Sequence, residues 1–288
     1  MTELSSARVA QAWTTFWATQ GPGSRCLTCA PPEIIEPLDA HWRSLATSLP
    51  QTAAVIDLGC GAGAVGSELL AGAPNLRITG IDIAIVPPSS DARITLLPCT
   101  PMELLPFADS SFGAAVSQFG YEYGRRVEAA NETARVLAPG APISFLIHHP
   151  GSPVVQGMTL HKRALEGLCG QPLRTAFLAG DGGALGEEIS RLARQCRGDP
   201  IVATAACGLR AHLVQDKARR AAVWKAIGEA LEPELVMLSA LDHWCIGYDR
   251  LDHWTGPLAR DFDMASPDVI RVRSGEPIAW AISGTRRR

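Results

Sequence analysis

A short apolar run followed at once by a glycine-rich loop is the feature that most restricts how this chain can fold. Residues 53–58 are apolar apart from Asp57, and glycine then occurs at positions 59, 61 and 63. The run predicts a buried strand, and the glycines let the backbone turn sharply and approach a ligand closely. We therefore expect a strand–loop–helix unit with a ligand site at the carboxyl end of the strand.

Strands and helices alternate further along the chain. Helices are expected over 64–71 and 128–137, and apolar runs predict strands over 76–81, 94–97, 113–117 and 143–147. Alternation at these intervals indicates a parallel sheet with helices on both faces. Two more apolar runs, 269–272 and 278–282, flank Ser274-Gly275, which predicts a tight turn between antiparallel strands. The expected fold class is α/β, a doubly wound and mostly parallel sheet of seven strands.

The length of 288 residues fits one such α/β domain with added helical material. We expect an N-terminal helical cap over residues 1–50 and the ligand-binding core over 51–150. Residues 151–242 show mainly amphipathic helical patterns and predict a helical insertion. A C-terminal helix and the closing strand hairpin of the core are expected over 243–288.

Two cofactors compete for the glycine loop. Residues 61–66 match the G-x-G-x-x-G pattern of dinucleotide-binding folds, and Asp82 lies near the distance expected of a ribose-binding acid. S-adenosylmethionine (SAM) would instead use Gly59, Gly61 and Gly63. The charge of Asp57, just before the loop, would repel a pyrophosphate and attract the ammonium group of SAM. Asp57 thus counts toward SAM, and the downstream segments, taken with the loop, favour SAM over a nicotinamide cofactor or a purely structural turn.

Four segments in register resemble the class I SAM-dependent methyltransferases, in particular the branch related to ubiquinone-biosynthesis C-methyltransferases. Residues 55–63 are similar to the acid-x-G-x-G-x-G loop of that family, and 78–83 to its second strand with the ribose-binding acid. Residues 105–112 are similar to its LPF-x-D-x-SF segment, and 134–140 to its RVLxPGG turn. The resemblance implies a Rossmann-like fold whose last strand is reversed, and SAM as cofactor.

The resemblance also implies roles for individual residues. Asp57 would hold the methionyl amine through water or backbone, Asp82 would accept both ribose hydroxyls, and Ile83 would pack on the adenine. An acid that commonly contacts the adenine amino group is replaced here by Cys99-Thr100-Pro101-Met102, so Thr100 or the backbone of Met102 would make that contact. The implied cofactor-binding residues are Asp57, Gly59, Cys60, Gly61, Asp82, Ile83, Thr100, Met102 and Gln118.

Residues at the ends of the fourth and fifth strands are the candidates for acting on the acceptor. His148 and His149 end the fifth strand, where an imidazole could take a proton from the acceptor or merely shape its pocket. Tyr121 and Tyr123 could line that pocket or pack within a loop. Trp17, with Trp13 and Phe16, could form part of a lid or belong to the core. The helical insertion is expected to hold the substrate pocket, and a homodimer contact there is left open.

Composition limits the partners. The 26 basic and 29 acidic residues give a net charge of −3, which provides no overall attraction to nucleic acid or to a membrane surface. No apolar run approaches the roughly 20 residues that span a bilayer, and residues 1–8 contain no apolar signal segment. Eight scattered cysteines suggest reduced thiols and a cytoplasmic protein. Cys26-x-x-Cys29 has no second pair, so no metal is expected.

The sequence therefore predicts a SAM-dependent methyltransferase that acts on a small molecule by in-line methyl transfer. A non-catalytic SAM-binding protein and an NAD(P)-dependent oxidoreductase are the alternatives from other classes. A methyltransferase that acts on RNA or protein is disfavoured by the even charge, and no Asn-Pro-Pro-Tyr-like motif follows the fourth strand.

Overall fold

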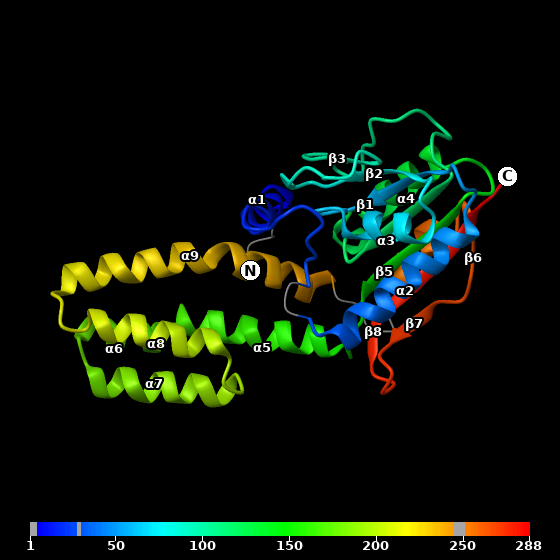
Figure 1. Cartoon of the computed structure of the whole chain (residues 1–288). Coiled ribbons are helices and arrows are strands. Elements are labelled where there is room, and N and C mark those ends of the chain that lie inside the picture. Colours follow the sequence, from blue (N-terminus) through cyan, green and yellow to red (C-terminus); the bar gives the residue numbers. More distant parts are fainter. Residues whose placement is uncertain (1–4, 28–29, 245–250) are drawn as a thin grey trace. The chain divides into compact units, whose positions relative to one another are not determined.

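The computed structural model describes residues 5–27, 30–244 and 251–288, and the chain divides into two compact units. One unit comprises Trp13–Val155 and Trp244–Arg288 and contains the sheet. The other comprises Met1–Ala12 and Gln156–His243 and is helical. Residues 13–50, expected to form a cap, thus belong to the same unit as the sheet. Figure 1 labels the elements of both units.

The sheet has the predicted α/β architecture. Five strands run parallel: β1 (Ala54–Leu58), β2 (Arg77–Ile81), β3 (Ile94–Leu97), β4 (Ala114–Gln118) and β5 (Pro142–His148). The last strand, β8 (Pro277–Arg286), is antiparallel to β5 and also pairs with β6 (Phe262–Met264) and β7 (Asp268–Arg271). The order is β3-β2-β1-β4-β5-β8-β6, with β7 beside β8.

The Rossmann-like fold with a reversed last strand is therefore confirmed. Within the residues that the structure describes, the sheet nevertheless has eight strands in place of the seven expected. The additional strand, β6, is only three residues long, and a segment of that length is too short to show an alternating pattern in the sequence.

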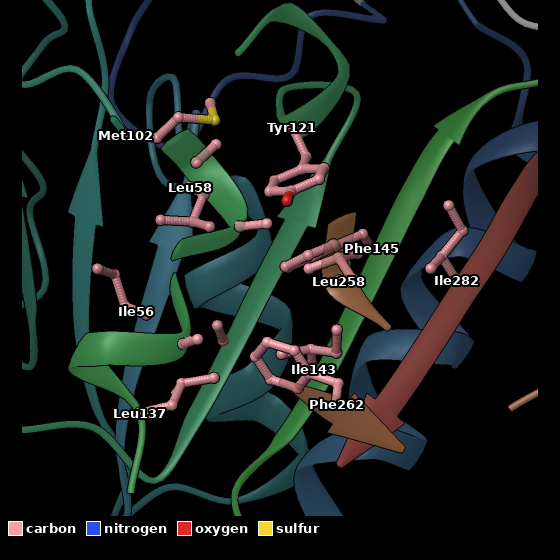
Figure 2. Close-up of a cluster of buried hydrophobic side chains, with 14 of the residues drawn as sticks. Ile56, Leu58, Met102, Tyr121, Leu137, Ile143, Phe145, Leu258, Phe262 and Ile282 are labelled. Carbon is pink, nitrogen blue, oxygen red and sulfur yellow. The ribbon is translucent and has the colours of Figure 1, made fainter. Parts of the chain in front are cut away.

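Helices cover both faces of the sheet because successive side chains of a strand point in opposite directions. Ile56 and Leu58 of β1 join a buried cluster with residues of α4 (Arg126–Val136) and α10 (Asp252–Leu258). Figure 2 shows this cluster. On the other face, α2 (Pro32–Ser48) contacts the sheet: its Trp42 donates a hydrogen bond to Gln118 at 2.6 Å. α3 (Ala64–Gly72) packs beside α2.

Arg135 of α4 joins two of the motif segments described above. Its guanidinium donates hydrogen bonds to the carbonyls of Leu105 (2.9 Å) and Phe107 (2.7 Å). It also pairs with Glu132 at 2.7 Å and with Asp109 at 2.9 Å. Arg135 thereby fixes the loop before β4 to α4, which explains on structural grounds why these two segments occur together.

The helical unit contains most of α5 (Pro153–Leu168) and α9 (Lys217–Trp244), with α6 (Gln171–Ala179), α7 (Gly182–Gln195) and α8 (Pro200–His212) between them. Leu173, Phe177 and Leu185 are among the buried residues of its separate core. The side chains of Asp181 and Asp199 cap α7 and α8 by accepting backbone N–H groups. The predicted helical character of this segment is thus observed.

Candidate functional site

The glycine loop joins β1 to α3 through three residues with positive φ: Gly59 (72°), Gly61 (50°) and Gly63 (84°). The N–H groups of Gly59 and Cys60 both donate to the carbonyl of Ile81 at 2.9 Å, which anchors the loop to β2. A β-carbon on Gly59 would lie only 2.9 Å from the Cα of Gly120. Glycine is thus required both by the backbone conformation and by the close approach of the loop after β4.

Asp57 lies at the carboxyl end of β1 and is 1% exposed. Neither of its carboxyl oxygens has a hydrogen-bond partner among the described residues. Burial, with the nearby Asp82 adding to it, raises the pKa of Asp57 to about 8. A buried carboxyl without a donor is costly, and a cationic ligand would relieve that cost.

Asp82 follows β2 and is also buried. Its Oδ2 accepts the Gly61 N–H and its Oδ1 accepts the Ala84 N–H, both at 2.9 Å. Burial raises the pKa of Asp82, and these two hydrogen bonds oppose the rise. Each carboxylate oxygen can accept a second hydrogen bond, so Asp82 is held in a fixed orientation and can still accept from a ligand.

The other predicted cofactor residues have different surroundings. Ile83 is 37% exposed, so its side chain is accessible to an adenine ring. The Thr100 N–H donates to the Asp82 carbonyl at 2.8 Å, which places Thr100 beside the ribose-binding candidate. The Met102 side chain packs in the core against Gly124, and the Cys60 side chain packs against Gly80, so either residue would contact a ligand through its backbone.

Aromatic residues of α1 (Ser6–Trp17) cover the glycine loop. A β-carbon on Gly61 would overlap the indole ring of Trp17, which is 5% exposed and packs with Ala62 and Ala84. Trp13 stacks on Trp17 with ring centroids 6.2 Å apart and meets Tyr123 edge-on at 6.0 Å. The aromatic residues of α1 therefore belong to the core and also cover the glycine loop, so the lid and core interpretations of these residues are compatible.

Tyr121 is placed in the core. It is 1% exposed and stacks on Phe145 with ring centroids 4.2 Å apart. Burial raises the pKa of its hydroxyl. Figure 2 shows the ring of Tyr121 above Phe145 within the buried cluster. Of the two interpretations of Tyr121, the structure agrees with aromatic packing, because its ring stacks on Phe145.

Glu122 is the residue at this edge of the sheet that the sequence analysis missed. It lies in the short 3-10 helix η1 (Tyr121–Tyr123) and is fully buried. Its Oε1 lies 2.7 Å from Nδ1 of His148 and accepts the His148 backbone N–H at 3.0 Å. The only hint in the sequence was an acid between two aromatic residues, which does not reveal a partner 26 positions away.

His149 has a different environment. Its Nδ1 accepts the Gly151 N–H at 2.9 Å, and its ring lies 4.4 Å from that of Trp280. Partial burial, with the Arg271 charge adding to it, lowers the pKa of His149. His148 is the more buried of the two histidines and the one with a carboxylate partner.

Two non-glycine residues near these groups have positive φ: Cys99 (53°) after β3 and Phe119 (59°) after β4. The Phe119 ring stacks on His148 with centroids 4.3 Å apart. Such conformations are disfavoured, and the surrounding structure must enforce them; they are common at functional sites, although Ser110 and Arg197 adopt them elsewhere. The carboxyl ends of β1, β2, β4 and β5 thus form one edge that carries the glycine loop, both buried acids and His148.

Within the described ranges, no cluster of three or more His, Cys, Asp or Glu side chains could hold a metal ion. None of the helices described is both long and apolar enough to cross a membrane. Burial raises the pKa of the Cys26 thiol to about 12, and Cys29 of the same C-x-x-C lies outside the described residues.

Known proteins were compared with the chain. A family described as a methyltransferase domain matches residues 55–140, and no curated protein sequence matches. Among solved structures, the N-methyltransferase NodS from Bradyrhizobium japonicum WM9, in complex with S-adenosyl-L-homocysteine, has 12% identity and a TM-score of 0.50. That comparison covers 98% of this chain and 100% of NodS.

Two further structures are less similar. A protein solved in a study of disulfide-to-thioacetal conversion during echinomycin biosynthesis has 16% identity and a TM-score of 0.47, covering 96% of this chain and 92% of the other. The 1,6-didemethyltoxoflavin-N1-methyltransferase of Burkholderia thailandensis has 10% identity and a TM-score of 0.40, covering 92% and 94%.

The family match covers the glycine loop, both buried acids and β1 to β4. The NodS likeness shows the fold. SAM is accordingly the cofactor of this domain, and the nicotinamide alternative is not favoured. Residues 55–140 match the methyltransferase domain family, and the unit that contains them has the fold of the class I, SAM-dependent methyltransferases.

Proposed function

We propose that this protein is an enzyme that transfers the methyl group of SAM to a small-molecule acceptor. The observation that carries the proposal is the buried Asp57 carboxyl, which lacks a hydrogen-bond donor among the described residues and lies beside Asp82 at the strand ends. An ammonium group would satisfy Asp57, and a ribose would satisfy the open acceptor positions of Asp82. These two carboxyl groups therefore fit the ammonium and ribose groups of SAM.

When bound, SAM would supply a methyl group attached to a positively charged sulfur. The acceptor's lone pair would bond to the methyl carbon while the electrons of the carbon–sulfur bond stay on sulfur. The protein's part is to align the acceptor and, where the acceptor is protonated, to take its proton. His148 is the last residue of β5, at the same edge as the glycine loop, and His149 follows it. We assign the acceptor contact to these histidines and to Tyr123, and replacement of the contacting histidine by alanine should lower the methylation rate.

The finer features of the proposal have their own support. The net charge of −3 supports a small-molecule acceptor over nucleic acid. The four motif segments support the ubiquinone-type branch. Unpaired thiols at Cys26, Cys60, Cys99, Cys169, Cys196 and Cys207 support a cytoplasmic location. Acceptor recognition by the helical insertion, and a homodimer contact, stay predictions.

Thermal unfolding with SAM, S-adenosylhomocysteine, NAD and NADP tests the cofactor. We expect only the two adenosyl sulfur compounds to raise the melting temperature, since a ligand at a hundred times its Kd adds about 2.7 kcal/mol of stability. Asp82→Ala should abolish the shift. Stabilisation by NAD or NADP alone would contradict the proposal, and adenosyl binding without turnover of any acceptor would indicate the non-catalytic alternative.

A further inference from the structure

The Glu122–His148 pair determines which ring nitrogen of His148 carries a proton. Oε1 of Glu122 accepts the backbone N–H of His148 and lies 2.7 Å from its Nδ1. An ionised carboxylate can only accept hydrogen bonds, so Nδ1 must be the donor. The neutral ring then has its lone pair on Nε2, which the ring geometry directs away from Glu122.

The pair lies next to the cofactor loop. Gly59 of the glycine loop and Gly120 are in such close contact that neither has room for a β-carbon. Gly120 directly precedes η1, which carries Glu122, and Phe119 stacks on the His148 ring. The strained backbone at Phe119 therefore connects the cofactor loop to the histidine–carboxylate pair.

The charge of Glu122 suits a ring that becomes cationic. Glu122 is fully buried, and its second oxygen, Oε2, has no hydrogen-bond donor in the part of the chain that is described. Among the described residues, His148 is the one that would form an ion pair with Glu122 once its ring is protonated. Cys26 interacts electrostatically with Glu122 but adds no charge there, because burial raises the pKa of its thiol to about 12 and keeps it neutral. A proton on Nε2 would give this buried carboxylate a full counter-charge.

We propose that Glu122 positions His148 to take the proton of the acceptor, and that the acceptor carries a hydroxyl or protonated amine at the atom to be methylated. The inference rests on the proposed function. The proton leaves the acceptor oxygen or nitrogen for Nε2, and its bonding pair stays on that atom. Nδ1–H remains bonded to Glu122, and the proton later passes to solvent. Glu122 acts as a positioning residue and touches no substrate.

The first experiment measures the tautomer without any acceptor. Nitrogen NMR of enzyme labelled at histidine, saturated with S-adenosylhomocysteine, should show the neutral form of His148 protonated at Nδ1 and unprotonated at Nε2. The spectrum of His148→Gln identifies the signal. Protonation at Nε2 alone would overturn the proposal.

The second experiment measures methylation of phenols, catechols and amines, and of thioethers and iodide, which have no proton to lose. We expect turnover of the protonated acceptors. His148→Gln should lower kcat by about 10²-fold or more with little change in KM. Glu122→Gln, which keeps a carbonyl acceptor but removes the charge, should shift the acidic limb of the kcat/KM profile to lower pH.

A matched control separates positioning from loss of structure. Glu103 is another largely buried carboxylate that accepts a backbone N–H, from Arg125 at 2.7 Å, and Glu103→Gln should leave the pH profile unchanged. An unshifted limb in Glu122→Gln, or turnover of the proton-free acceptors alone, would refute the inference. If adenosylhomocysteine fails to bind, the proposed function itself fails. If it binds but no acceptor reacts, the protonated nitrogen of His148, measured in the first experiment, supports or refutes the inference.

Discussion

At the scale of single residues, Asp57 shows how a site can be recognised from an energetic cost. Its carboxyl is buried without a described donor, and burial raises its pKa to about 8. Asp82, by contrast, is held by two backbone N–H groups. Asp57 would therefore gain from a cationic partner, and Asp82 is held in a fixed orientation from which it can accept further hydrogen bonds.

We predict that binding of adenosylhomocysteine is coupled to ionisation of Asp57. Below about pH 8 the carboxyl is mostly protonated, and the ligand's ammonium requires the charged form. Affinity should therefore rise with pH up to about 8, by at most tenfold per unit. Calorimetry near pH 6.5 should detect release of up to one proton. Asp57→Asn should abolish this release, whereas Asp252→Asn, at an exposed carboxylate, should not.

A second residue-scale prediction concerns Gly61 and Trp17. Gly61→Ala should destabilise the fold through its positive φ and through overlap with the indole. In a Trp17→Ala background only the conformational cost should remain, about 1–2 kcal/mol. Urea unfolding of the four proteins of this cycle measures the difference. Equal costs in both backgrounds would show that the indole does not lie on the loop.

At the scale of elements, Arg135 shows that a sequence motif can be structural. Its hydrogen bonds to the Leu105 and Phe107 carbonyls and its pairing with Glu132 fix the loop before β4 to α4. The hydrogen bond with Glu132 lowers the pKa of that carboxyl, as expected of a close ion pair.

Arg135→Met should cost about 2–3 kcal/mol in the free energy of unfolding, because several backbone and carboxylate acceptors lose a charged donor together. Arg125→Met, which removes an exposed pair with Glu128 at the start of the same helix, should cost less than about 1 kcal/mol. Chemical denaturation checks both. Similar losses in the two variants would contradict the structural role of Arg135.

At the scale of the whole molecule, each unit has its own core and can respond separately to pH. In the helical unit, His161 of α5 pairs with Asp199 at 2.8 Å and with Glu234 at 3.2 Å. The hydrogen bond to Glu234, with that to Asp199, raises the pKa of His161 to about 9. The charged ring thus links α5, α8 and α9 at neutral pH.

We predict that this stabilisation is complete below about pH 6.5, the ordinary pKa of histidine, and is lost as pH rises through 9. Hydrogen exchange in peptides from residues 156–243 should accelerate over that range more than in peptides from β1 to β5. His161→Gln should remove the difference. An unchanged profile in the variant would show that another group is responsible.

The fold was largely predictable because its signals are local. Apolar runs and the glycine loop placed β1 to β5 and β7 within one residue at each end, and the start of β8 within one residue, although β8 extends four residues beyond its expected end. The three-residue β6 escaped, since its pairing with β8 and not its own pattern makes it a strand. Tyr121 left two readings open in the sequence, because an aromatic residue after a strand can face a ligand or stack on Phe145.

The sequence by itself determined the succession of strands along the chain and the glycine turn after β1 with Asp57, because each depends on residues adjacent in the chain. The place of Asp82 beside that turn follows from the pairing of β1 with β2. Only the tertiary structure decided that Glu122 meets His148 and that Trp17 covers Gly61. Those partners are far apart in sequence and are brought together by packing of the sheet, η1 and α1. Local sequence patterns do not reveal contacts between residues so far apart in the chain.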